Sequence, residues 1–198
     1  MSNDGVNEGR RRVLTALTSV VGAAGVVGAA VPFVNSWNPS AKARAAGAPV
    51  EFNISKLEPG QMATVEWRGK PVYVVRRTAE ALKTLDQVTE RLRDPASIKS
   101  DQPAYAKTPT RAPEGKEEFF IMLAVCTHLG CAPEYRPEVG DAEVEANWLG
   151  GFFCKCHGSK FDLAGRVFQG VPAPKNLEIP PYKYLTDDVV LIGEDQEA

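Results

Sequence analysis

The residues of this chain that are best suited to chemistry lie in two short segments. One segment reads Cys-Thr-His-Leu-Gly-Cys over residues 126–131, and the other reads Cys-Lys-Cys-His-Gly-Ser over residues 154–159. Together they hold all four cysteines and both histidines of the sequence. Thiolate and imidazole groups are metal ligands, and residues placed at random would not form two such matching groups. The sequence therefore predicts a metal centre held between two loops.

The ligand types indicate which metal centre this is. Each segment offers one Cys and one His at close spacing, together with one further Cys. This is the ligand set of an iron–sulfur centre in which two His replace two Cys on one of the two irons. One residue separates Cys126 from His128 and two separate Cys154 from His157, so the four side chains can converge from two tight loops. Two neutral imidazoles raise the potential above that of an all-Cys cluster.

Three other kinds of site use the same residue types. A structural zinc site spaces its ligands C-x₂₋₄-C and H-x₃₋₅-H, whereas each segment here mixes Cys with His. Two plain disulfides would leave both histidines incidental, and a single bare iron would leave part of the set unused. The agreement in type, order and spacing favours a two-iron cluster over all three.

The two segments resemble the C-T-H-L-G-C and C-x-C-H-G-S boxes of Rieske iron–sulfur proteins. The additional cysteine in each segment resembles the branch of that family found in quinol-oxidising respiratory complexes. The resemblance implies one [2Fe–2S] Rieske cluster. It implies these roles: Cys126 and Cys154 as ligands of one iron, His128 and His157 as ligands of the other, and Cys131–Cys156 as a disulfide. A disulfide of this kind needs an oxidising compartment.

The resemblance also implies roles for residues around the cluster. Leu129 resembles an apolar shield that shapes the docking surface, and Ser159 resembles the serine whose hydroxyl bonds a bridging sulfide. Pro172 lies in a proline-rich segment, residues 170–174, that resembles the loop covering the third side of the cluster. Phe161 stands where many high-potential relatives have a Tyr bonded to a ligand sulfur. Because Phe161 has no hydroxyl, we expect a lower reduction potential than in those relatives.

Residues 1–37 are predicted to form a membrane anchor. Arg10–Arg12 precede an uncharged, apolar stretch over residues 13–34, which is long enough to cross a bilayer as a helix. The arginines and the apolar residues after them resemble a twin-arginine export signal. The alanines at positions 41, 43 and 45 form two segments that resemble A-x-A cleavage sites. However, the apolar stretch is longer than that of an ordinary signal peptide, and this favours a retained anchor.

The arginines also predict the orientation of the chain. Basic residues flanking a membrane helix stay on the cytoplasmic side, so the remainder is expected on the periplasmic side of a bacterial inner membrane, as a single-pass protein. Residues 38–49 have no large apolar side chain and are interpreted as a flexible hinge linker. The resemblance implies that this hinge lets the head swing between partners, although its alanines also permit a helix.

Residues 50–198 are predicted to form a mainly β domain, an antiparallel β-sandwich with a cluster-binding subdomain inserted at about residues 123–176. Strands are expected at residues 50–54, 62–67, 72–77, 119–125, 148–153, 161–162, 166–168, 182–185 and 189–192. A helix is expected over residues 79–92, where apolar residues recur at helical spacing. Residues 94–115 are interpreted as a loop, and residues 133–147 as a polar excursion between the two boxes.

The resemblance implies the function of an electron-transfer subunit in a proteobacterial-type ubiquinol–cytochrome c reductase. Such a subunit works with cytochrome b, takes one electron from ubiquinol and a proton on a ligand histidine, and passes the electron to a c-type cytochrome. His157 is favoured over His128 as the quinol contact. The chain would act as a subunit of this translocase, in a dimeric complex among membrane lipid, and would not be catalytic alone.

Two other functions share the export signal and the cluster. One is the small Rieske subunit of a periplasmic molybdenum oxidase such as arsenite oxidase, and the other is a free exported electron carrier. The expected helix and loop insertion and a retained anchor favour the reductase. The chain of 198 residues has a formal net charge of −2, so it has no basic footprint for nucleic acid.

Overall fold

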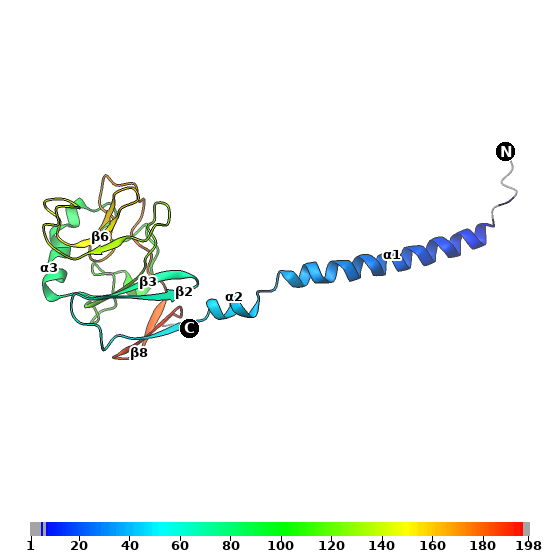
Figure 1. Cartoon of the computed structure of the whole chain (residues 1–198), viewed down its shortest axis with the longest axis horizontal. Coiled ribbons are helices and arrows are strands. Elements are labelled where there is room, and N and C mark those ends of the chain that lie inside the picture. Colours follow the sequence, from blue (N-terminus) through cyan, green and yellow to red (C-terminus); the bar gives the residue numbers. More distant parts are fainter. Residues whose placement is uncertain (1–4, 6, 196–198) are drawn as a thin grey trace. The chain divides into compact units, whose positions relative to one another are not determined.

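The computed structural model describes residue 5 and residues 7–195. The predicted anchor over residues 1–37 and the predicted domain over residues 50–198 therefore each include residues that lie outside the described ones, 1–4 and 6 in the first and 196–198 in the second. The chain divides into two compact units, residues 1–45 and residues 46–198. Figure 1 shows the elements of both. The second unit is called the head below.

The first unit is dominated by the helix α1 (Glu8–Ser36). Its first turn is capped by Asn7, whose side chain accepts a hydrogen bond from the backbone N–H of Arg10 at 3.0 Å. Apolar side chains lie free along its length, and Val20, Val21 and Phe33 are 68–72% exposed. With a mean hydropathy of 1.9 in its most apolar window, the helical stretch is long and apolar enough to cross a membrane. The predicted N-terminal apolar helix is thus confirmed.

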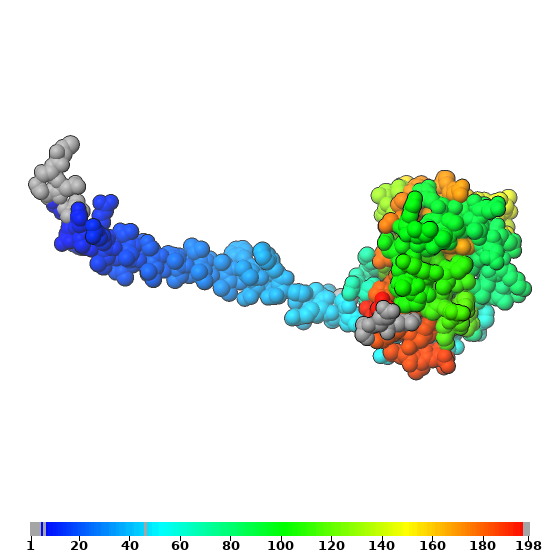
Figure 2. Space-filling model, turned by 180° about the vertical axis from the view of Figure 1, so that it is seen from behind, coloured from blue at the N-terminus to red at the C-terminus, as the bar shows by residue number. Residues whose placement is uncertain are grey.

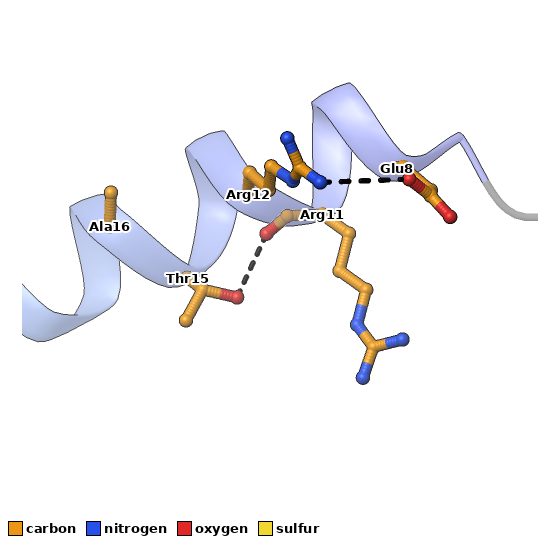
Figure 3. A pocket seen from close by; sticks show the side chains of 5 residues that line it. All are labelled: Glu8, Arg11, Arg12, Thr15 and Ala16. Carbon is orange, nitrogen blue, oxygen red and sulfur yellow. Dashed lines mark hydrogen bonds and ion pairs between the residues drawn. The ribbon is translucent and has the colours of Figure 1, made fainter.

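The first turns of α1 carry the basic residues. Arg12 lies 3.8 Å from Glu8, and the Thr15 hydroxyl donates a hydrogen bond to the Arg11 carbonyl at 2.8 Å. Figure 3 shows both contacts and the Arg11 side chain extending away from the helix. After α1, a short helix α2 (Ala41–Ala46) occupies the middle of the predicted hinge. Alanine has a high helix propensity, so the alanines of this segment favour the helix.

The head contains three antiparallel sheets of three strands each among its described residues. The strand orders are β1-β9-β8, β2-β3-β4 and β5-β6-β7. The bounds are β1 (Val50–Asn53), β2 (Met62–Trp67), β3 (Lys70–Arg76), β4 (Phe119–Leu123), β5 (Glu134–Arg136), β6 (Gly151–Cys154), β7 (Ser159–Phe161), β8 (Tyr182–Thr186) and β9 (Val189–Ile192). The third sheet lies within the predicted cluster-binding subdomain, residues 123–176.

One hydrophobic core joins the sheets. Every residue of β4 is buried, and Phe120 and Ile121 pair with Val75 and Val74 of β3. The core also includes Tyr182 from the first sheet and residues of the third sheet. Full burial of one such side chain stabilises the fold by about 1.5–3 kcal/mol. This mainly β body with antiparallel sheets confirms the predicted fold class.

The predicted helix over residues 79–92 is too long at its C-terminal end. Helix α3 spans Ala79–Gln87, and a 3₁₀ turn, η1 (Thr89–Arg91), follows it. Leu92 is extended, with φ −90° and ψ 149°, and pairs with Phe168 in an isolated bridge. The apolar spacing therefore continues past the helix because Leu92 is buried in the main hydrophobic core from a strand-like backbone.

Two predictions around the third sheet also need correction. The expected strand at residues 148–153 begins only at Gly151, because Gly150 has φ 91°, which is not a strand conformation. Gly151 packs directly against Phe161, and a Cβ at this position would lie 2.0 Å from the Phe161 carbonyl oxygen. The polar excursion at residues 133–147 contains the edge strand β5. Tyr135 of β5 packs on Phe152 with ring centroids 5.5 Å apart.

The segment between η1 and β4 is mostly irregular, as predicted for residues 94–115, and contains the 3₁₀ turn η2 (Ala104–Ala106). Figure 2 shows the green part of the chain, which includes this segment, covering much of one face of the head. Tyr105 fastens it there, because its hydroxyl bonds both the N–H and the carbonyl of Tyr182, at 2.8 and 2.7 Å.

Three buried guanidinium groups converge on the turn over residues 162–166. Arg166 lies 2.7 Å from Asp162, and both side chains are 2% exposed. Arg77 donates to the Leu163 carbonyl at 3.2 Å, and Arg111, from the irregular segment, donates to the Ala164 carbonyl at 3.2 Å. Burial lowers the pKa of Arg77 to about 10, so this group remains a cation at neutral pH. The carbonyls and one carboxylate offset the cost of burying these charges.

Replacing Asp162 with Asn should destabilise the head strongly. The change leaves Arg166 buried without its counter-ion, and breaking a buried ion pair in this way costs about 3–5 kcal/mol. Urea unfolding of the full chain in detergent, followed by tryptophan fluorescence, would measure the loss. Asp187→Asn is a matched control, because Asp187 pairs with Lys116 at 2.8 Å but is 95% exposed, and it should change stability little. Equal effects of the two substitutions would contradict the account.

Candidate metal centre

The two Cys/His segments are delivered by neighbouring parts of the head. The first segment follows β4, and the second connects β6 to β7, so that Cys154 and Ser159 are paired across the hairpin. Both loops are closed in the same way. The Gly130 N–H donates to the Cys126 carbonyl and the Gly158 N–H donates to the Cys154 carbonyl, each at 2.9 Å. The chain thus builds two copies of one tight turn.

The conformation of these turns requires glycine. Gly130 has φ 88° and Gly158 has φ 75°, a left-handed region in which a side chain is strained. The positive φ lets each glycine N–H turn back toward the carbonyl of the cysteine that begins the loop. The cysteine and the histidine of each segment are thereby held on the same short turn.

A disulfide joins the two loops. Cys131 and Cys156 are bonded across a sequence separation of 25. The sulfur atoms of Cys131, Cys154 and Cys156 lie within 4.8 Å of one another, but only Cys154 of these three is a free thiol. The disulfide therefore places the beginning of the second loop beside the end of the first and does not itself supply ligands.

The two free thiols lie at the base of the loops. Cys126 and Cys154 are 2% and 3% exposed. Burial raises the pKa of the Cys126 thiol, a hydrogen bond from the His128 backbone N–H lowers it, and the neighbouring Cys154 thiol raises it. The Cys126 thiol by itself therefore resists ionisation, whereas a bound metal deprotonates coordinating thiols outright. The donor set fits a metal with sulfur affinity.

The two imidazoles lie nearer the surface. The ring centroids of His128 and His157 are 4.8 Å apart, and the rings are almost perpendicular, at 89°. His157 is exposed and His128 is half-buried. The same pair of loops therefore presents two buried thiols and two imidazoles that are less buried than the thiols. The four predicted ligands come from two loops that are held together, as a two-iron cluster with mixed ligands requires.

A third loop, residues 170–176, is fastened to both segments. The Ser159 hydroxyl accepts a hydrogen bond from the Ala173 N–H at 3.1 Å. The Thr127 hydroxyl donates to the Lys175 carbonyl at 2.7 Å. Pro172 lies exposed in this loop. The sequence did not lead us to predict a role for Thr127, although its hydroxyl lies between the predicted ligands Cys126 and His128.

The remaining predicted site residues differ in their surroundings. Leu129 is 71% exposed although it is apolar, as a docking contact would be. Phe161 is fully buried in β7 and lies opposite Phe152 in the sheet register. A hydrogen bond from the Ser159 hydroxyl lowers the pKa of the Cys126 thiol. A serine and a phenylalanine thus line the hairpin that carries the second loop.

Comparison with protein families matches almost the whole chain. Residues 49–183 match the family model described as the Rieske [2Fe–2S] domain. Residues 1–40 match the family model described as the ubiquitinol-cytochrome C reductase Fe-S subunit TAT signal. The two matches correspond to the head and to the N-terminal helix region.

Two relatives and one solved structure match most of the chain. The chain is 58% identical to the ubiquinol-cytochrome c reductase iron-sulfur subunit of Allochromatium vinosum, over 99% of this chain and 94% of that protein. It is 41% identical to the subunit of the same name from Blastochloris viridis, over 97% of each. Among solved structures, a chain of a hyperthermophilic respiratory Complex III matches with 26% identity and a TM-score of 0.45, covering 88% of this chain and 98% of that one.

Proposed function

Because the chain belongs to the Rieske iron–sulfur subunit family of ubiquinol–cytochrome c reductases, we propose that it carries electrons from quinol to a c-type cytochrome. The observation that supports this most directly is the exposed imidazole of His157, which lies beside that of His128, while the two free thiols on the same loops are buried. A nitrogen at the surface is available to a quinol, whereas the sulfur ligands are shielded from solvent. The relatives from Allochromatium vinosum and Blastochloris viridis are subunits of this reductase, which favours it over a molybdenum oxidase or a free carrier.

The proposed ligands are Cys126 and Cys154 for one iron and His128 and His157 for the other. The [2Fe–2S] cluster supplies one-electron chemistry, at a potential that the two imidazole ligands raise. The disulfide and the glycine-closed turns hold the four side chains in place. Ser159 and the 170–176 loop, including Pro172, exclude water from the sulfur side, because Ser159 and Ala173 are fully buried.

His157 is the proposed hydrogen-bond partner of the quinol. Its ring is on the exposed side of the second loop, and its free nitrogen accepts a hydrogen bond from the quinol hydroxyl. That nitrogen would hold the one proton that the quinol loses, and the one electron would pass to the bound cluster. Leu129 contributes an exposed apolar contact beside the ring pair, which helps to keep water away from the quinol hydroxyl. The chain is not catalytic alone, since cytochrome b completes the quinol site.

The proposed setting is the inner membrane of a bacterium. The helix α1 would cross it once, with Arg10–Arg12 in the cytoplasm and the head in the periplasm. There the head would meet cytochrome b and a c-type cytochrome subunit within a dimeric translocase that contributes to the proton-motive force. Residues 38–49, with α2 inside them, are the proposed hinge between anchor and head.

Electron paramagnetic resonance of reduced membranes would test the function. We expect a rhombic signal with a low average g value, and a shift of that signal when an inhibitor occupies the quinol site. The shift follows because the inhibitor replaces the quinol as the hydrogen-bond partner of His157. His157→Gln should abolish the signal or the shift. A signal that no quinol-site inhibitor alters would contradict a role in quinol oxidation.

Phe161→Tyr should raise the reduction potential. The new hydroxyl can donate to a ligand sulfur and stabilise the more negative reduced state, by the equivalent of about 1 kcal/mol, the net contribution of one hydrogen bond. A redox titration followed by circular dichroism would measure the change. Phe168→Tyr is the matched control, because Phe168 is also buried but packs against Trp148. An unchanged potential in Phe161→Tyr would contradict the prediction.

A further inference from the structure

The three loops around the proposed cluster carry little charge, and all of it is positive. These loops, residues 126–131, 154–159 and 170–176, contain two charged side chains, Lys155 and Lys175. The whole chain has a formal net charge of −2, so the remainder of the chain is more acidic than the chain as a whole. The charged side chains that the three loops themselves contribute are thus cations, on a chain that is acidic as a whole.

Both lysines are half-exposed, and each is paired with a carboxylate from outside the loops. The Lys155 Nζ lies 3.0 Å from the Glu134 carboxylate of β5, with side chains 54% and 42% exposed. The Lys175 Nζ lies 3.1 Å from the Asp101 carboxylate, with side chains 46% and 68% exposed. Exposed ion pairs of this kind contribute little to stability. Either carboxylate can therefore be replaced by another anion at small cost.

The lysines lie next to the accessible part of the site. Lys155 stands between Cys154 and Cys156 and two residues before the exposed His157. The backbone of Lys175 accepts the hydrogen bond from Thr127, which places it against the first loop. One lysine therefore belongs to the loop of His157 and the other contacts the loop of His128 and Leu129.

We propose that Lys155 and Lys175 are docking contacts for the acidic rim of the electron-accepting c-type cytochrome. This inference rests on the proposed function. A haem carries two propionate groups, so the edge at which it exchanges electrons is anionic, whereas a quinol is uncharged. The two lysines therefore match the acceptor better than the donor. On docking, anionic groups of the cytochrome replace Glu134 and Asp101 as partners of the two ammonium groups.

Complementary charge of this kind mainly affects how fast the two proteins meet and how the head is oriented on the cytochrome. Leu129 supplies an exposed apolar contact near the imidazole rings, and the lysines supply charged contacts beside it. A salt-dependent contact suits a carrier that must leave its partner after each transfer, because small ions compete for it. The carboxylates would keep the ammonium groups paired while the head is away from the cytochrome.

Single-turnover kinetics in the purified complex would test the proposal. The double variant Lys155→Gln/Lys175→Gln should slow electron transfer from the reduced cluster to the cytochrome c haem by roughly two- to fivefold for each lysine at low ionic strength, the effect of one exposed ion pair. It should also remove most of the salt dependence of that step. Asp101→Asn should have the opposite effect, because it frees Lys175 for the cytochrome.

The matched control is Lys183→Gln. Lys183 pairs with Glu194 at 2.7 Å on the sheet of β8 and β9, outside the three loops, and its loss should change neither rate nor salt dependence. Removing positive charge near the cluster lowers its potential and favours transfer to the haem, so slower transfer cannot come from that change. Titrating the potential of each variant would verify this direction.

Three outcomes would overturn parts of the account. A double variant with the wild-type rate and salt dependence would eliminate the docking role. Slowing confined to reduction of the cluster by quinol would assign the lysines to the cytochrome b side instead. If the wild-type cluster failed to reduce the haem at all, the proposed function itself would fail, and this result is distinct from the other two.

Discussion

The structure depends on holding two loops together, so that the buried thiols of Cys126 and Cys154 are neighbours and the imidazole ring centroids of His128 and His157 lie 4.8 Å apart. Each thiol alone would be a buried polar group, and burial raises the pKa of the Cys126 thiol. Each imidazole alone would be an ordinary residue near the surface. Their value lies in convergence, which neither loop achieves by itself. The disulfide between Cys131 and Cys156 and the two glycine-closed turns fix that convergence. The rest of the head supports these turns.

Support comes from both sides of the loops. Beneath them, the fully buried strand β4 and the β6–β7 hairpin anchor the two segments in one core. Behind the hairpin, Arg77, Arg111 and Arg166 bind the turn over residues 162–166, at considerable cost in desolvation. Beside the loops, Thr127 and Ser159 tie the 170–176 loop in place. The outer surface is left apolar and cationic, which suits brief contact with partners.

Sequence alone was sufficient where a local pattern has one solution. Short segments rich in strand-forming residues and bounded by turns predicted β2 and β9 with their observed bounds, and the Cys/His boxes predicted the two loops. It failed where distant parts decide the conformation. Leu92 has helical spacing but belongs to a strand-like segment because Phe168 pairs with it. Strand β5 has a charged residue on each side of Tyr135, so only its pairing with β6 reveals it. Nothing in the sequence around Arg111 indicates that its side chain donates to the Ala164 carbonyl.

The central claim is that two histidines and two cysteines bind one two-iron cluster. Pulsed electron paramagnetic resonance of the reduced protein, prepared with ¹⁵N-labelled histidine, tests it most directly. The account predicts strong couplings from two histidine nitrogens, and loss of one of them or of the cluster when either His128 or His157 is replaced. A reduced cluster without ¹⁵N coupling, or a purified protein without iron after anaerobic handling, would contradict it.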